Sequence, residues 1–356
     1  MGVKLDHVRD LHGDPASPMK WPNSAAVFDD GRIAVADSGH NRATVLTPEG
    51  DMIWQGGQQG FSTGDLREPI YVFVTPDQYL LVSDWHNHRF CVYRPDLSVS
   101  HVLGHLGRLS PVRGVRDGVR LCLSFLSNLA IEYVGAPYYF TPSKMKNGCP
   151  EKPKRSLKML IRGLWHYARN WPELKAIFTD TRTAMMKPNG AVFRDGHLIV
   201  AQKGHQCLSE YKVANDWRDL DLVRHVKDFN SGDTFLRLCN MSQDPQGRIY
   251  VCDQKRWRIV VFDKELNYNE EITFTDDGRY PDGPFSCAVL NADYIAVAIG
   301  FKVEVRALDG GKIVAELDGF GETHGIAWDE ARQYLYFVDR SESCLRQIKV
   351  TFGEER

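Results

Sequence analysis

One pattern recurs along the chain: two short apolar runs joined by a tight turn. This repetition restricts the fold more than any other feature of the sequence. β-branched and aromatic residues fill the runs, and many turns contain D-G, Q-G or V-G, which supply the positive φ that hairpin turns need. Seven segments fit the pattern: AAVFDDGRIAVAD, YVFVTPDQYLLVSD, LAIEYVGAPYYFT, AVFRDGHLIVAQ, MSQDPQGRIYVCD, AVLNADYIAVAIG and GIAWDEARQYLYFVD.

A third strand-like run follows most hairpins, and a weaker outer run comes after it, as in ATVLTPEG and DMIWQGG. Four strands per unit, at a spacing of roughly forty to sixty residues, are typical of a β-propeller, because each sheet buries its faces only against neighbouring sheets. The sequence predicts an all-β, seven-bladed β-propeller that occupies residues 1–356 as a single domain. A six-bladed ring is the alternative, in case the irregular third hairpin is not a blade.

The two ends of the chain complement each other. The last unit stops after its third strand, CLRQIKVTF, while KLDHVRDLHG precedes the first hairpin without a blade of its own. We therefore expect the N-terminal segment to supply the outer strand of the last blade and to cover an exposed sheet edge.

A charged pair marks three of the units. An Asp closes the second strand and an Arg follows five residues later: Asp37 and Arg42, Asp84 and Arg89, Asp253 and Arg258. This spacing resembles the signature of NHL repeats, in which the two side chains clasp the turn between strands. The resemblance implies a propeller fold, but it does not imply one activity, because such propellers include enzymes, binding modules and scaffolds.

The third hairpin is followed by a segment unlike a blade, which we interpret as a helical insertion over residues 142–186, within or after the third blade. Its helix is expected near residues 150–180, where one helical face carries Leu157, Leu160, Ile161, Leu164, Trp165 and Ala168. Basic residues cover the remaining surface. The helix can lie on the propeller with its charged face in water, or act as a lid or as a docking surface for a partner.

Composition restricts the possible partners. With 44 Lys and Arg against 46 Asp and Glu, the net charge of −2 disfavours nucleic acid as a ligand. The N-terminus lacks the apolar run of a signal peptide, and no stretch of about eighteen apolar residues predicts a membrane span. The eight cysteines are dispersed, as expected for reduced thiols, and the sequence predicts a cytoplasmic protein.

Loops that enter the innermost strands of a propeller open on the same face as the loops between second and third strands. Both sets carry polar residues that we take as candidate ligand-binding residues: Asn23, Arg67, Asn128, Asn189, Arg237 and His324 from the first set, His86 and His205 from the second. Arginine and asparagine side chains in such positions suit a carboxylate-bearing or peptide-like ligand.

The leading functional prediction is a binding or scaffold module for a protein or a small polar ligand. The alternative is a hydrolase, lyase or isomerase with its site at the channel mouth, so the sequence leaves open whether the protein is an enzyme. Peptidylglycine amidating lyase, a related propeller, places zinc-binding His residues where inner strands begin, and only His324 matches here. No cofactor is predicted, and a divalent metal at His324 is a weak alternative.

Overall fold

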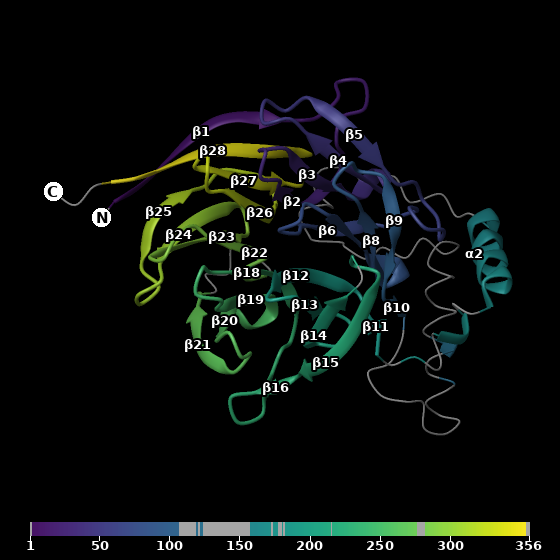
Figure 1. The fold of residues 1–356 in the computed structure, drawn as a ribbon. Coiled ribbons are helices and arrows are strands. Elements are labelled where there is room, and N and C mark those ends of the chain that lie inside the picture. The colour runs from purple at the N-terminus through teal and green to yellow at the C-terminus, as the bar shows by residue number, and fades with distance from the viewer. Residues whose placement is uncertain are drawn as a thin grey trace.

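The computed structural model describes residues 2–106, 157–171, 174–176, 180, 182–214, 216–275 and 282–353, together with 119, 122 and 123. In this described part, six four-stranded sheets surround a common centre, and helix α2 (Leu157–Arg169) lies at the outer side of the ring (Figure 1). The chain therefore forms an all-β, six-bladed β-propeller. We number the sheets as blades 1 to 6 in the order of their innermost strands.

The strands of blades 1 to 3 are given from the innermost outward. Blade 1 contains β2 (Pro22–Val27), β3 (Ile33–Asp37), β4 (Arg42–Leu46) and β5 (Met52–Gly56). Blade 2 contains β6 (Pro69–Val74), β7 (Leu80–Asp84), β8 (Arg89–Tyr93) and β9 (Val99–Leu103). Blade 3 contains β12 (Pro188–Arg194), β13 (His197–Gln202), β14 (Cys207–Ala214) and β15 (Asp219–Val226).

Blades 4 to 6 follow the same order. Blade 4 contains β18 (Leu238–Gln243), β19 (Ile249–Asp253), β20 (Arg258–Phe262) and β21 (Tyr268–Thr273). Blade 5 contains β22 (Ser286–Val289), β23 (Tyr294–Ile299), β24 (Lys302–Ala307) and β25 (Ile313–Leu317). Blade 6 contains β26 (Thr323–Asp329), β27 (Tyr334–Asp339), β28 (Cys344–Phe352) and β1 (Val3–Leu11). The short strands β16 (Asp228–Phe229) and β17 (Asp233–Thr234) form a separate hairpin.

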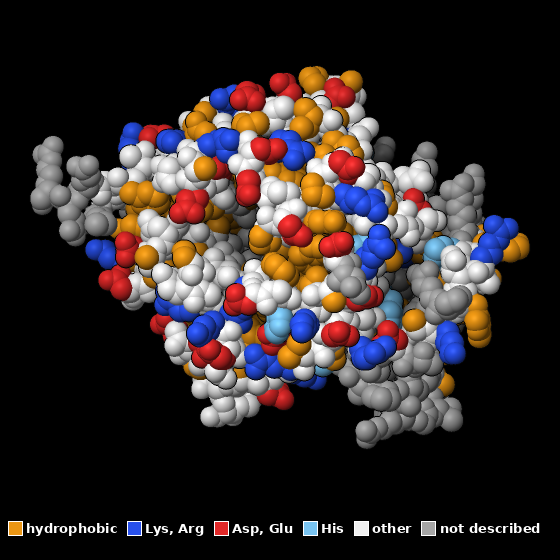
Figure 2. All heavy atoms as spheres, in the orientation of Figure 1, with side chains coloured by type: hydrophobic (Ala, Val, Ile, Leu, Met, Phe, Trp, Pro, Cys, Tyr) orange, Lys and Arg blue, Asp and Glu red, His pale blue; other side chains and the backbone are white. Residues whose placement is uncertain are grey.

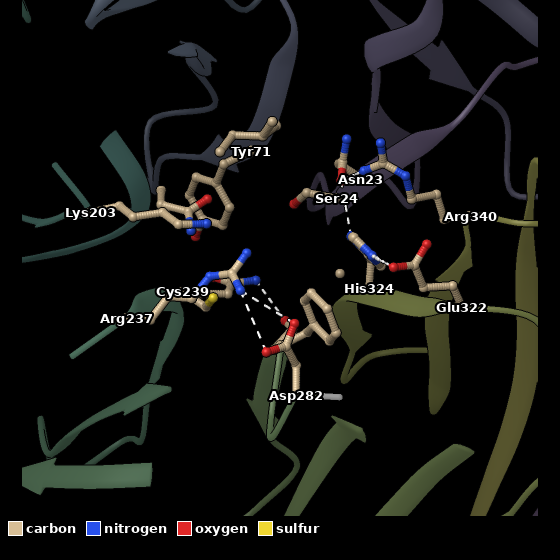
Figure 3. Close-up of a pocket in the computed structure, with 16 residues that line it drawn as sticks. Asn23, Ser24, Tyr71, Lys203, Arg237, Cys239, Asp282, Glu322, His324 and Arg340 are labelled. Atoms are coloured by element: carbon tan, nitrogen blue, oxygen red, sulfur yellow. Dashed lines mark hydrogen bonds and ion pairs between the residues drawn. The ribbon is translucent and has the colours of Figure 1, made fainter. Parts of the chain in front are cut away.

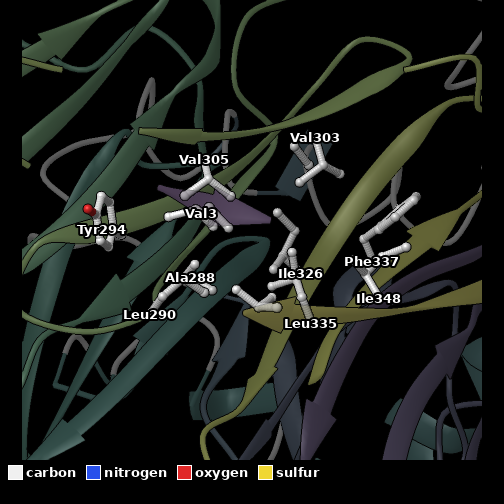
Figure 4. Close-up of a cluster of buried hydrophobic side chains, with 13 residues drawn as sticks. Val3, Ala288, Leu290, Tyr294, Val303, Val305, Ile326, Leu335, Phe337 and Ile348 are labelled. Carbon is white, nitrogen blue, oxygen red and sulfur yellow. The ribbon is translucent and has the colours of Figure 1, made fainter. Parts of the chain in front are cut away.

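Neighbouring blades pack face to face through apolar side chains. One buried cluster lies in each interface between consecutive blades, and these clusters account for the continuous apolar runs of the middle strands. Between blades 5 and 6, for example, Val303 and Val305 of β24 face Ile326, Leu335 and Phe337 (Figure 4). Since each sheet is covered on both faces only by its neighbours, the ring buries its core as a unit.

The main prediction of seven blades is wrong, and the alternative of six is confirmed. Blade 2 packs directly on blade 3: the Tyr71 hydroxyl donates to the Ala191 carbonyl over 2.9 Å, and the Ser83 hydroxyl donates to the Pro188 carbonyl over 2.6 Å. Their shared apolar cluster leaves no room for another sheet between them. The third predicted hairpin, residues 129–141, lies outside the described residues.

The chain leaves the ring and returns to it at one place. Strand β10 (His105–Leu106) pairs in parallel with β11 (Ala184–Met185), so the ends of the long connection between blades 2 and 3 meet. Helix α2 belongs to this connection. Its Tyr167 is buried and packs edge-on against Phe61, with the ring centres 6.1 Å apart. The bounds of the predicted insertion, 142–186, fall partly outside the described residues and stay a prediction.

The first and last strands of the propeller belong to the same blade. β1 pairs in antiparallel fashion with β28, with Val3 opposite Phe352, so the two ends of the chain lie side by side (Figure 1). Charged side chains cover much of the surface, while hydrophobic ones gather around the centre of the ring (Figure 2). None of the helices described is long and apolar enough to cross a membrane.

Candidate functional site at the channel mouth

In blades 1, 2 and 4 the Asp that ends the second strand binds the Arg five residues later, a contact that we call the clasp. The same Asp also holds the loop that enters the innermost strand. Asp84 accepts a hydrogen bond from Arg89 Nε over 2.8 Å at one carboxylate oxygen, and the other oxygen accepts the Arg67 backbone N–H over 2.7 Å. The second contact fixes the loop that enters the inner strand. Asp37 and Asp253 bind in the same way, with their arginine partners at 2.7 and 3.3 Å.

The turn inside each clasp has a fixed backbone conformation. A short 3-10 turn follows the Asp, and the residue before the Arg adopts a left-handed conformation, with φ of 54° at Asn41, 60° at His88 and 53° at Trp257. In two of these turns the residue that directly follows the Asp contacts a residue of the channel mouth: Ser38 accepts a hydrogen bond from Asn23, and Gln254 accepts one from Cys239. The clasps therefore give the mouth a rigid rim, on which side chains can be held in position.

These loops enclose a cavity of about 70 Å³ at the centre of the ring (Figure 3). Since one water molecule needs roughly 10–15 Å³, the cavity has room for a small polar group. Every blade contributes to its lining, which combines polar side chains with apolar surface: Asn23, Ser24, Ile70, Tyr71, Asn189, Lys203, Arg237, Cys239, Asn240, Asp282, Phe285, Ser286, Glu322, His324, Gly325 and Arg340.

One side of the cavity carries an ion-pair network. Arg237 Nη1 lies 3.3 Å from Asp282 Oδ2, and the same carboxylate also binds Lys255. Lys203 extends towards this pair from the turn after β13 (Figure 3). The Asp282 carboxylate thus balances two cations, one of which lines the cavity.

The opposite side is built around His324. Its Nδ1 lies 2.9 Å from Asn23 Oδ1, its Nε2 lies 3.3 Å from Glu322 Oε1, and its ring stacks on Phe285 with the ring centres 4.3 Å apart. Arg340 Nη1 also donates to Asn23 Oδ1, over 2.5 Å, which identifies that atom as the acceptor.

Among the described residues that line the cavity, cations outnumber carboxylates. The cations are Lys203, Arg237 and Arg340, and the carboxylates are those of Asp282 and Glu322. Burial, together with the nearby charges of Arg237 and Lys187, lowers the pKa of Lys203 to about 8, against the opposing effects of Cys239 and Asp282. Cations that outnumber carboxylates in the described lining favour an anionic ligand.

The structure brings together four of the predicted residues, Asn23, Asn189, Arg237 and His324, in the cavity lining. The other described candidates have different surroundings: Arg67 is 1% exposed and packs over Phe61, His86 contacts Glu68 at 2.9 Å, and His205 contacts Gln202 at 2.8 Å. Asn128 lies outside the described residues.

Sequence reasoning missed Lys203 and Arg340, which occupy the same position in their repeats. Each directly follows the residue that ends the second strand, Gln202 in blade 3 and Asp339 in blade 6. The sequence therefore contained a signal for both residues. Each is a charged residue directly after the clasp position, which is the last residue of the second strand. Glu322 and Asp282 come from loops entering inner strands, the class of loop from which Arg67 was chosen.

A metal site at His324 stays a prediction. In the part of the chain that the structure describes, no group of three or more His, Cys, Asp or Glu side chains is arranged to hold a metal ion. The partners of His324 are instead an amide oxygen and one carboxylate.

No protein-family model and no curated protein matches this chain. Among solved structures, it is similar to a streptogramin B lyase, with 8% identity, a TM-score of 0.53 and 98% of each chain covered. It is also similar to the Swd1 β-propeller domain of Myceliophteria thermophila, with 10% identity, a TM-score of 0.55 and coverage of 98% of this chain and 100% of that one. A gluconolactonase from Xanthomonas campestris shares 12% identity, with a TM-score of 0.56 and coverage of 98% and 90%.

At these identities the similarity shows the propeller fold alone. The neighbours include two enzymes and one propeller domain, so the fold is compatible with both classes of function. The resemblance to NHL repeats stays a prediction.

Proposed function

We propose that this protein binds a small polar ligand carrying a carboxylate or a comparable anion at the channel mouth. The observation that carries the proposal is the convergence of Lys203, Arg237 and Arg340 on one small cavity, in which two carboxylates stand against these three cations among the described lining residues. Asparagine and serine side chains in the same lining supply hydrogen bonds to polar groups of a ligand. A cytoplasmic location is part of the proposal, supported by free thiols at the described cysteines.

The test uses glycolate as a minimal anionic probe and ethylene glycol as its neutral analogue, observed by saturation-transfer NMR. We expect glycolate to bind and ethylene glycol not to bind. Arg340→Met is expected to weaken glycolate binding roughly tenfold, because a hydrogen bond to a charged group contributes about 1.5–3 kcal/mol. Arg182→Met is the matched control, since the Arg182 side chain is 78% exposed and lies outside the cavity.

Arg237→Met serves as a second variant, because Arg340 also supports Asn23 and its replacement can disturb folding. Equal signals from glycolate and ethylene glycol, or unchanged glycolate binding in both cavity variants, would contradict the proposal.

A second candidate function is a hydrolase, lyase or isomerase, favoured by the position of His324 between Asn23 and Glu322 inside the cavity. An imidazole paired with a carboxylate is suited to general acid–base catalysis. The fold shared with a lyase and a gluconolactonase adds support. Turnover of small esters or lactones that is lost in His324→Gln but kept in Arg182→Met would favour the enzyme over the binding module.

The binding proposal also includes a protein partner, which would dock on helix α2 and not at the channel mouth. The outer surface of α2 exposes Ile161, Leu164 and Trp165, the last to 57%. Such side chains suit a docking surface better than a solvated helix.

A further inference from the structure

Lys203 differs from the other cations at the mouth because its side chain is also a nucleophile. It begins in the turn after β13, where its backbone N–H donates to the Lys187 carbonyl over 3.1 Å, and its amine lies 5.7 Å from the ring centre of Trp85. Lys187 Nζ lies over the same ring at 4.2 Å. The backbone of Lys203 is therefore held, and its side chain reaches from an aromatic surface into the cavity.

Two arginines share the cavity with this amine. Arg237 lies on the same side of the cavity as Lys203 and Arg340 on the opposite side, and a guanidinium binds a carboxylate more specifically than an amine does (Figure 3). A ligand whose carboxylate meets Arg237 can bring its neighbouring carbon to Lys203, whose charge Arg237 already affects. We propose that the cavity takes a small carbonyl acid, an aldehyde acid or α-keto acid, and that Lys203 forms an imine with its carbonyl group. This inference rests on the proposed anion-binding function.

The chemistry needs no further reactant. The lone pair of the neutral Nζ attacks the carbonyl carbon, the N–C bond forms, and the carbonyl π electrons pass to oxygen. A proton moves from Nζ to that oxygen and gives a carbinolamine. The hydroxyl group then leaves as water with one proton from solvent, and a protonated C=N bond remains.

The electrostatic surroundings make the amine available for this step. Burial, together with the positive charges of Arg237 and Lys187, lowers the pKa of Lys203 to about 8. An ordinary lysine is almost wholly protonated at neutral pH, whereas with a pKa of about 8 roughly one Lys203 amine in ten is neutral at pH 7. A lysine that is desolvated beside other cations is a known arrangement for an imine-forming nucleophile.

The experiment traps the imine in the intact protein with glyoxylate and sodium cyanoborohydride at pH 7.5, followed by peptide mass spectrometry. Each reacted lysine gains a carboxymethyl group. We expect Lys203 to be modified at least about tenfold faster than Lys302, since one pKa unit changes the neutral fraction tenfold. Lys302 is the internal reference because it is bound by Glu304 and Glu316. In Lys203→Arg the trapped product is expected to be absent, and excess glycolate should slow its formation in the wild type.

The two proposals fail in different ways. Modification of Lys203 at the same rate as Lys302, in a protein that binds glycolate in the NMR assay, would overturn the imine and leave the anion site in place. If glycolate does not bind and Lys203 is modified no faster than Lys302, both the anion site and the imine are overturned. Acetaldehyde is the control probe: modification of Lys203 by acetaldehyde as fast as by glyoxylate would show that the arginines do not direct the acid, and it would overturn the proposed ligand class.

Discussion

Arg346 on β28 donates a hydrogen bond through Nη1 to the carboxylate of Asp10 on β1, 336 residues earlier in the chain. The same guanidinium binds Asp339 through Nη2 over 2.9 Å, so one side chain completes the clasp of blade 6 and fastens its outer strand. In this blade the Arg lies seven residues after the Asp, where the other clasps have five.

Removal of this guanidinium is expected to destabilise the closed ring. Arg346→Met breaks hydrogen bonds to two carboxylates, and a hydrogen bond to a charged group contributes about 1.5–3 kcal/mol, so we expect a loss of about 1–3 kcal/mol in the free energy of unfolding. Urea denaturation measures it. The control is Lys4→Met on the same strand, because Lys4 and Asp6 form a pair that is 72% and 46% exposed and should contribute less than about 0.5 kcal/mol. Equal stabilities of the two variants would show that the contact has no role in closure.

The contact of Asp233 in β17 with Arg258 in blade 4 should make the stability of the fold sensitive to acid. Hydrogen bonds from Arg258 and Arg256 lower the pKa of Asp233 to about 2. Because the folded pKa lies below the unfolded one, the stabilisation is present above about pH 4 and is lost as the pH falls towards 2. The free energy of unfolding measured from pH 5 to pH 2 should therefore fall less steeply in Asp233→Asn than in the wild type. Asp309→Asn, in the turn after β24, is the control and should follow the wild-type curve.

The buried thiols are expected to resist modification. Burial raises the pKa of Cys91 and of Cys344 to about 12 and that of Cys207 to about 11, whereas Cys122 is exposed. The thiolate is the reactive form. With maleimide at pH 7.5, mass spectrometry should find label on Cys122 and none on the three buried residues, and all four should react after denaturation. Native labelling of Cys91 as fast as Cys122 would contradict the packing of blade 2.

Helix α2 is expected to depend on one aromatic contact. Tyr167 is buried against Phe61. Trp165, two residues earlier and on another face of the helix, is 57% exposed. Tyr167→Ala should release the helix, and limited trypsin digestion should then cut after Arg169 several times faster. Trp165→Ala should leave the cleavage rate unchanged. Since the contact is peripheral to the blades, the urea midpoint of the propeller should stay the same in both variants.

Anion binding should weaken in alkaline solution. Lys203 is charged below its pKa of about 8 and neutral above it, so the positive charge of the cavity falls as the pH passes through this value. We expect the affinity for glycolate to drop severalfold between about pH 7 and pH 9, consistent with the loss of one charge at close range. In Lys203→Arg the charge persists and the affinity should stay nearly constant. A pH-independent affinity in the wild type would mean that Lys203 lies too far from the anion to matter.

The propeller could be predicted from sequence because its blades repeat a local pattern. IAVAD, IYVCD and YLYFVD each form a buried second strand that ends on the clasp Asp. The blade count could not be predicted in the same way. Whether a hairpin joins the ring depends on what packs beside it, and the Tyr71–Ala191 contact that joins blades 2 and 3 links residues 120 positions apart.

The candidate site was predicted in part for a similar reason. Asn23 and His324 were recognised by their place before inner strands, but their contact across 301 residues follows only from closure of the ring. Lys203 was missed because its importance comes from Trp85 and Arg237, which lie on other blades. A linear motif contains no information about such neighbours unless the topology is already known.

The pairing of β1 with β28 also determines the order in which the protein can mature on the ribosome. Strands of blades 1 to 5 are close in sequence within each blade, so these sheets can assemble as the nascent chain emerges. β1 is made before β28, and until β28 has been made the edge of β1 lacks its partner. During synthesis this open edge is a surface on which β28 of a neighbouring nascent chain can pair, which is the route to a strand-exchanged dimer.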